Sequence, residues 1–264
     1  MRGRKSETRR PSVVLLVPLL AVGVALASWI SPWLLAAYTA AVASAFLMSA
    51  LRCVPRLGSE ARLLGVVVVA AVAASPFVAI QWGEPGLFSL VGVATILCGT
   101  SLVFEGVRPG VVTDLSMAVA FFLYFGLPLA YLALIRAGYG HRALLASGLI
   151  VVCYELGKRL VGDRSGGVTG TWERWAPRAS GTVACEVGSV ISGSFLAPPA
   201  ATNSLLLLGG AVAVGLVLGE KTHQMIGELP LIKRKGARER AFAPFSILLF
   251  ALPAFLYSYR VLLT

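Results

Sequence analysis

Residues 63–80 read LLGVVVVAAVAASPFVAI, eighteen consecutive positions without a charged side chain. A helix of about 20 apolar residues crosses the hydrocarbon core of a bilayer, which is roughly 30 Å thick. Within that core only helices and closed barrels satisfy their backbone hydrogen bonds, and a barrel needs an alternation of polarity that this stretch lacks. The stretch therefore predicts a transmembrane helix.

Similar apolar runs recur along the whole chain of 264 residues, of which 57% are hydrophobic and only 13% are charged. These runs predict nine spans, at 12–30, 32–51, 63–80, 87–104, 115–135, 143–156, 180–197, 203–219 and 242–263. At about 20 residues for each span, little of the chain remains for a separate soluble domain. We therefore expect an all-α, polytopic integral membrane protein that forms a single transmembrane domain over residues 1–264.

The Lys and Arg residues lie mostly in alternate connections between these spans. Of the 23 in the chain, 20 fall on the same side as the N-terminus, beginning with the basic tail at residues 1–11. Because positive residues accumulate on the cytoplasmic side, we expect a cytoplasmic N-terminus, cytoplasmic loops at 157–179 and 220–241, and a multi-pass protein of the cell (inner) membrane. The net charge of +11 is then explained by contact with anionic lipid, without a nucleic-acid partner.

Three glutamates lie near the cytoplasmic ends of predicted spans: Glu155, Glu186 and Glu220. An ionisable group at membrane depth is costly and tends to mark a functional site. Carboxylates bind Mg²⁺ together with substrate phosphates, while the neighbouring Lys and Arg residues can bind phosphates directly. The pattern indicates a site for a metal-bound nucleotide or an anionic lipid headgroup. The alternative that stays open is that these charges only pair with one another and close the helix ends.

Three stretches in the second half of the chain combine acids, glycines and basic residues in a particular order. The first is Glu155-Leu-Gly157-Lys-Arg-Leu-Val-Gly162, and the second is Ala176-Pro177-Arg178-Ala-Ser180 with Glu186 six residues later. The third contains Gly219-Glu220 or Gly227-Glu228, followed by Lys233-Arg234 and Gly236-Ala-Arg238-Glu239. In order and spacing these stretches resemble the motifs of the phosphatidate cytidylyltransferase (CDP-diacylglycerol synthase) family.

This resemblance implies a membrane nucleotidyltransferase of phospholipid biosynthesis, which transfers CMP from CTP to phosphatidate and gives CDP-diacylglycerol and pyrophosphate. It implies that the catalytic residues are Glu155, Ser180 and Glu186. It implies that substrate phosphates contact Arg178, Lys233, Arg234 and Arg238, and that Mg²⁺ is held by Glu155, Glu186, Glu220, Glu228 and Glu239. The implied partners are phosphatidate or another anionic lipid, CTP and the bilayer.

The chain lacks the family's lysine between Ser180 and Glu186 and the family's His-Gly-Gly element before the last span. Enzymatic activity therefore stays open beside a second interpretation, a catalytically impaired relative that binds lipid or nucleotide as a partner subunit. A small membrane transporter and a lipid kinase are further alternatives. The absence of an internal repeat and of charge near the middle of a span argues against the transporter. The oligomeric state also stays open, with a homodimer as one alternative.

Overall fold

The computed structural model describes residues 11–51, 62–104, 110–162, 171–195, 202–228 and 235–263, which are helical almost throughout. The helices are α1 (Pro11–Ile30), α2 (Pro32–Leu51), α3 (Arg62–Phe104), α4 (Val111–Gly162), α5 (Thr171–Ser192), α6 (Thr202–Glu228) and α7 (Lys235–Leu263), with a short 3-10 turn, η2, at Gly193–Phe195. The predicted all-α class is therefore confirmed.

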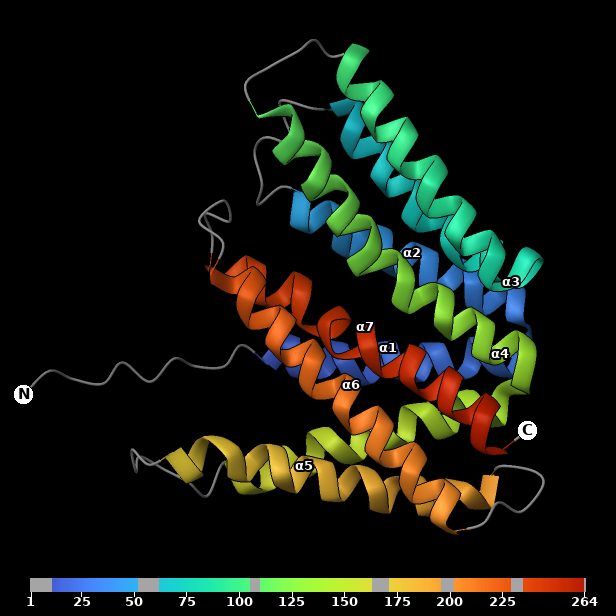
Figure 1. The fold of residues 1–264 in the computed structure, drawn as a ribbon, viewed down its shortest axis with the longest axis vertical. Helices are drawn as coiled ribbons and strands as arrows, with labels where there is room; N and C mark the ends of the chain where they lie inside the picture. The colour runs from blue at the N-terminus through green and yellow to red at the C-terminus, as the bar shows by residue number, and fades with distance from the viewer. Residues whose placement is uncertain are drawn as a thin grey trace, which may run out of the picture.

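Helices α3 and α4 each reverse direction at a glycine (Figure 1). Gly83 has φ 65° and ψ −153°, and Gly140 has φ 84° and ψ 179°. Glycine adopts such conformations readily, whereas a Cβ atom makes them costly for other residues. With both helices divided in two, the described residues form nine helical segments. The reversal at Gly83 falls between the spans predicted at 63–80 and 87–104.

Four helices are long and apolar enough to cross a membrane within the described residues: Pro32–Leu51, Arg62–Phe104, Val111–Val161 and Thr202–Thr222. Large apolar side chains on them face outward, among them Val66, Ile96 and Leu207. Helix α5 is not among these four; it is less apolar, and its sequence includes Arg178 and Glu186. These features support a membrane protein, although length and apolarity do not establish all nine predicted spans.

Several helices extend beyond the apolar runs from which they were predicted. Helix α4 continues to Gly162, α5 begins at Thr171, α6 continues to Glu228 and α7 begins at Lys235. Much of the connections predicted at 157–179 and 220–241 is therefore helical rather than loop. The physical reason is that hydrogen bonds along a helix join backbone groups, so polar side chains do not end a helix where the apolar run ends.

The core has two main parts that share α2, α4 and α7. In the first, ring centroids of Phe125 and Phe245 lie 4.7 Å apart, and Phe46 lies 5.6 Å from Phe245, which joins α2, α4 and α7. The second part joins the C-terminal half of α4 to α5, α6 and α7, with Tyr154 and Phe255 fully buried. Because lipid is as apolar as these side chains, close packing holds such helices together in a membrane. The second part leads directly to the candidate site through Tyr154.

Candidate functional site

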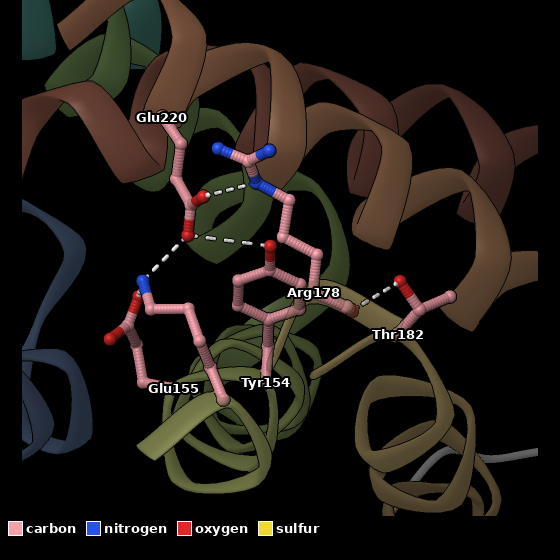
Figure 2. Close-up of polar contacts among 6 residues, drawn as sticks. Tyr154, Glu155, Arg178, Thr182 and Glu220 are labelled. Carbon is pink, nitrogen blue, oxygen red and sulfur yellow. Dashed lines mark hydrogen bonds and ion pairs between the residues drawn. The ribbon is translucent and has the colours of Figure 1, made fainter. Parts of the chain in front are cut away.

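Charged side chains from three helices meet where α4, α5 and α6 approach one another. The Nζ atom of Lys158 on α4 lies 2.9 Å from Glu155 Oε1 and 2.6 Å from Glu220 Oε1 on α6. Arg178 Nε on α5 lies 3.3 Å from the other carboxylate oxygen of Glu220. Figure 2 shows these contacts together with Tyr154. We call the group of Tyr154, Glu155, Lys158, Arg178 and Glu220 the Glu220 cluster.

Glu220 is the centre of this cluster because three side chains donate hydrogen bonds to its carboxylate. Besides Lys158 and Arg178, the Tyr154 hydroxyl donates to Glu220 Oε1 over 3.4 Å. The Glu220 side chain is only 14% exposed and that of Arg178 only 16% exposed. A carboxylate so far removed from water keeps its charge at low cost only with partners of this kind. The two acids and two bases of the cluster also balance in formal charge.

Helical spacing orients the two cations of the cluster independently of α6. Lys158 follows Glu155 by three positions and Tyr154 by four, so all three side chains share one face of α4. The Lys158 ammonium lies 5.7 Å from the centroid of the Tyr154 ring, within the range of a cation–π contact. On α5, the Arg178 guanidinium lies 5.5 Å from the centroid of the Trp175 ring, three positions earlier.

A close contact beside the cluster fixes how α4 faces α5. The Ser180 hydroxyl donates a hydrogen bond to the carbonyl oxygen of Gly157 over 2.9 Å. A Cβ atom at Gly157 would lie 2.6 Å from Ala184 Cβ and 2.7 Å from the Ser180 carbonyl oxygen, so the approach requires glycine. The Ser180 hydroxyl is therefore directed at the backbone of α4, and it links two of the three motif stretches.

The structure brings together three of the predicted site residues, Glu155, Arg178 and Glu220. Glu186 lies elsewhere on α5, eight residues beyond Arg178, which corresponds to about 12 Å along a helix. Its Cα atom instead lies beside Gly209 of α6, 2.9 Å from the position that a Cβ atom would take there. The residue of α5 that contacts Glu220 is therefore Arg178 and not Glu186. Arg178 can do so because α5 begins at Thr171, nine residues before the predicted apolar run.

The structure does not describe the side chains of the other five predicted residues. Lys233 and Arg234 fall between the described ranges. Glu228 lies at the end of α6, and Arg238 and Glu239 lie in the first turns of α7, but only the backbone is described at these positions. Their predicted roles in binding phosphate and metal remain predictions.

Tyr154 and Lys158 belong to the cluster although the sequence did not assign them to the site. The signal that could have found them is their spacing around Glu155 on one helix face. An aromatic ring and a lysine at those positions favour an ordered ammonium group beside the acid. The spacing does not predict that both side chains contact Glu220, because that contact depends on how α4 and α6 pack together.

The carboxylates of the Glu220 cluster contact cationic side chains in this arrangement. Mg²⁺ is commonly held by one or two carboxylates together with waters and substrate phosphates, and no group of three His, Cys, Asp or Glu side chains that could hold a metal ion occurs among the described residues. Between Glu155 and Glu220, the Lys158 ammonium already supplies the positive charge. What the cluster offers is a pair of partly buried cations whose carboxylate partners a phosphate group could replace.

Comparison of the chain with protein-family models and with curated proteins gives no match. The functional argument therefore starts from the Glu220 cluster and from the motif stretches that contribute to it.

Proposed function

We propose that the protein is a membrane-embedded phosphatidate cytidylyltransferase-like protein that handles its substrates at the Glu220 cluster. In this proposal the nine helical segments cross the cell (inner) membrane, with the N-terminus and the Glu220 cluster at the cytoplasmic face. A phosphate oxygen of phosphatidate attacks the α-phosphorus of CTP, the bond between the α- and β-phosphates breaks, and pyrophosphate leaves. CDP-diacylglycerol is the lipid product.

The observation that carries this proposal is that three motif stretches, far apart in the sequence, contact one another. Residues 155–162 contribute Glu155 and Lys158, residues 176–186 contribute Arg178, and Gly219-Glu220 contributes the acid that contacts both cations. The first two stretches also pack together directly where Ser180 donates to the Gly157 carbonyl. Ion pairs between packed helices can also serve stability alone, but a shared phosphate site would require residues of these three stretches to meet, and the cluster meets that requirement.

The cations of the cluster are suited to phosphate. Transfer of phosphoryl and nucleotidyl groups depends mostly on positioning the phosphates and neutralising their charge. Arg178 presents a planar fork of donors and Lys158 a compact ammonium, and either would form charge-assisted hydrogen bonds with a phosphate that displaced Glu220. A site at the cytoplasmic interface would receive CTP from water and phosphatidate from the inner leaflet. Mg²⁺ enters the proposal as an assay component, with no described residue assigned to it.

A second candidate is a catalytically impaired relative that binds anionic lipid or nucleotide as a partner subunit. The position of Lys158 between Glu155 and Glu220 favours it, because those oxygens are engaged by a lysine rather than directed at a metal ion. The absence of the family's lysine between Ser180 and Glu186 also favours the impaired relative. Loss of one charge-stabilising group costs about 3–4 kcal/mol in the transition state, which suppresses turnover without abolishing binding.

One assay separates the two candidates. The full chain is purified in detergent, reconstituted into phosphatidylcholine vesicles, and incubated with radiolabelled CTP and phosphatidate, with Mg²⁺ present or removed by EDTA. Label that enters the lipid extract only when phosphatidate is present supports the enzyme. Retention of CTP or phosphatidate without transfer supports the binding subunit. A wild-type protein that neither transfers label nor binds either compound contradicts both.

A further inference from the structure

A separate pocket of about 200 Å³ lies between the second half of α3 and the first half of α4. Helix α3 contributes Glu84, Leu87, Phe88 and Val91 to its lining, and α4 contributes Leu123, Leu127 and Tyr131. Phe88 is 70% exposed, so the pocket opens to the surface of the bundle. Val91 follows Glu84 by seven positions, which gives the pocket a length of about 10 Å along the helix.

The pocket is polar at one end only. Glu84 Oε2 accepts a hydrogen bond from the Tyr257 hydroxyl over 3.4 Å, and Tyr257 in turn lies 3.5 Å from the Tyr131 hydroxyl. Arg260 Nη1 lies 3.5 Å from Glu84 Oε1. We call Glu84, Tyr131, Tyr257 and Arg260 the Glu84 end. The other lining side chains are all apolar.

The Glu84 end lies far from the Glu220 cluster. Gly215 of α6 packs against the backbone of Phe250 of α7, and the two helices run in opposite directions (Figure 1). This contact places Glu220 toward the beginning of α7, whereas Tyr257 and Arg260 lie near its end. In a membrane the two polar groups would therefore belong to opposite leaflets. The apolar part of the pocket would then extend from one interface into the hydrocarbon, half of which is about 15 Å thick.

The charges of the Glu84 end select one kind of occupant. The pair of Glu84 and Arg260 is long, and the Arg260 side chain is 58% exposed, so the pair is easily opened. A headgroup with a primary ammonium and a phosphate can satisfy both partners, the ammonium at Glu84 and the phosphate at Arg260. A quaternary ammonium has no N–H group to donate, and a purely anionic headgroup would leave Glu84 facing like charge.

We propose that this pocket binds a zwitterionic phospholipid with a primary-ammonium headgroup, taken from the leaflet opposite the Glu220 cluster, with one acyl chain lying between α3 and α4. The headgroup replaces the contact of Glu84 with Arg260, and the chain covers Leu87, Val91 and Leu127. This binding requires that the protein resides in a membrane and is independent of cytidylyl transfer.

Native mass spectrometry of the full chain in detergent tests this binding with equimolar dioleoyl-phosphatidylethanolamine, dioleoyl-phosphatidylcholine and dioleoyl-phosphatidylglycerol. We expect phosphatidylethanolamine to be retained about fivefold more than the other two, which is the most that a partly exposed ion pair contributes. Glu84→Gln should remove this preference but leave some binding. Leu127→Trp should reduce retention of all three lipids because the indole fills the pocket.

Val93→Trp is the matched control, since Val93 is exposed on α3 and does not line the pocket. This variant should retain lipids as the wild type does. If Leu127→Trp does not fold, Phe88→Asp at the exposed lining position serves the same purpose without changing the core. Equal retention of the three lipids by the wild type would overturn the headgroup assignment. Wild-type retention by a folded Leu127→Trp or Phe88→Asp variant would overturn the pocket as the binding site.

Discussion

At the scale of single residues, Glu220 and Lys158 depend on each other. The Glu220 carboxylate is largely buried and accepts hydrogen bonds from three side chains, whereas Lys158 contacts two carboxylates at once. Without the ammonium, Glu155 and Glu220 would repel each other across a partly buried space. A neutral Glu220 would need no such counter-charge. Lys158 is therefore needed for stability mainly while Glu220 is ionised.

We expect Lys158→Met to lower the free energy of unfolding by about 1–3 kcal/mol, because a partly buried carboxylate loses a charged partner. Adding Glu220→Gln to the same chain should recover part of that loss, as a double-mutant cycle would show. The matched control is Lys221→Met, which changes an exposed lysine next to Glu220. Chemical unfolding in detergent, followed by circular dichroism, measures these differences. Equal losses for the two lysine variants would contradict the dependence.

At the scale of elements, the contact between α5 and α6 sets the geometry of the site. Cys185 Sγ donates to the Gly209 carbonyl over 3.2 Å, and the Ser189 hydroxyl donates to the Leu205 carbonyl over 2.6 Å. Small residues allow helices in membranes to approach in this way. Because the two helices run in opposite directions, the pairing of Cys185 with Gly209 places Arg178 about one helical turn from the level of Glu220, and the two side chains span that distance.

Gly209→Ala should lower the free energy of unfolding by about 1–3 kcal/mol, because the added Cβ atom overpacks the helix contact. The Cβ atom added at position 209 would lie 2.6 Å from Ser189 Oγ and 2.9 Å from Glu186 Cα. Gly210→Ala, one position further, meets no atom within 4 Å and should be neutral or slightly stabilising. Thermal unfolding of the two variants in the same detergent compares them. A Gly209→Ala variant as stable as Gly210→Ala would show that the helices are further apart.

At the scale of the whole molecule, the fold separates two polar groups at opposite ends of the bundle. Glu155, Lys158, Arg178 and Glu220 join α4, α5 and α6 at one end. Glu84 and Arg260 join the reversal of α3 to the end of α7 at the other. If the nine helical segments all cross the membrane, these two ends face different compartments. The excess of Lys and Arg then assigns the first end to the cytoplasm.

Cysteine labelling tests this orientation. In a cysteine-free background, Trp82→Cys and Lys221→Cys each place one thiol at an exposed position, near the reversal of α3 and near Glu220 respectively. We expect a membrane-impermeant maleimide to label Trp82→Cys in intact cells and Lys221→Cys only after the membrane is permeabilised. Labelling of both positions in intact cells would contradict a topology in which the segments alternate.

The helices were predictable from the sequence wherever an apolar run has clear limits. The predicted span at residues 32–51 coincides with α2, because Ser31 precedes the run, Pro32 begins it and a basic segment follows it. The ends of α4, α5 and α6 were not predictable in this way, since their polar residues continue the helix. In the site, Glu155 and Glu220 were predictable as acids at the ends of apolar runs. The contacts of Tyr154 and Lys158 with Glu220 depend on how α4 packs against α6. The periodicity of one sequence does not predict how two helices pack.

The central claim is that the Glu220 cluster binds substrate phosphate, and transfer of label from CTP to phosphatidate tests it most directly. The measurement compares wild type, Lys158→Met and Lys221→Met in reconstituted vesicles, with retention of CTP and phosphatidate recorded in the same samples. We expect Lys158→Met to reduce transfer, or retention if no transfer occurs, by about tenfold, since a charge-assisted hydrogen bond to phosphate is lost. Lys221→Met should match the wild type. Unchanged transfer and retention in a folded Lys158→Met protein would contradict the claim.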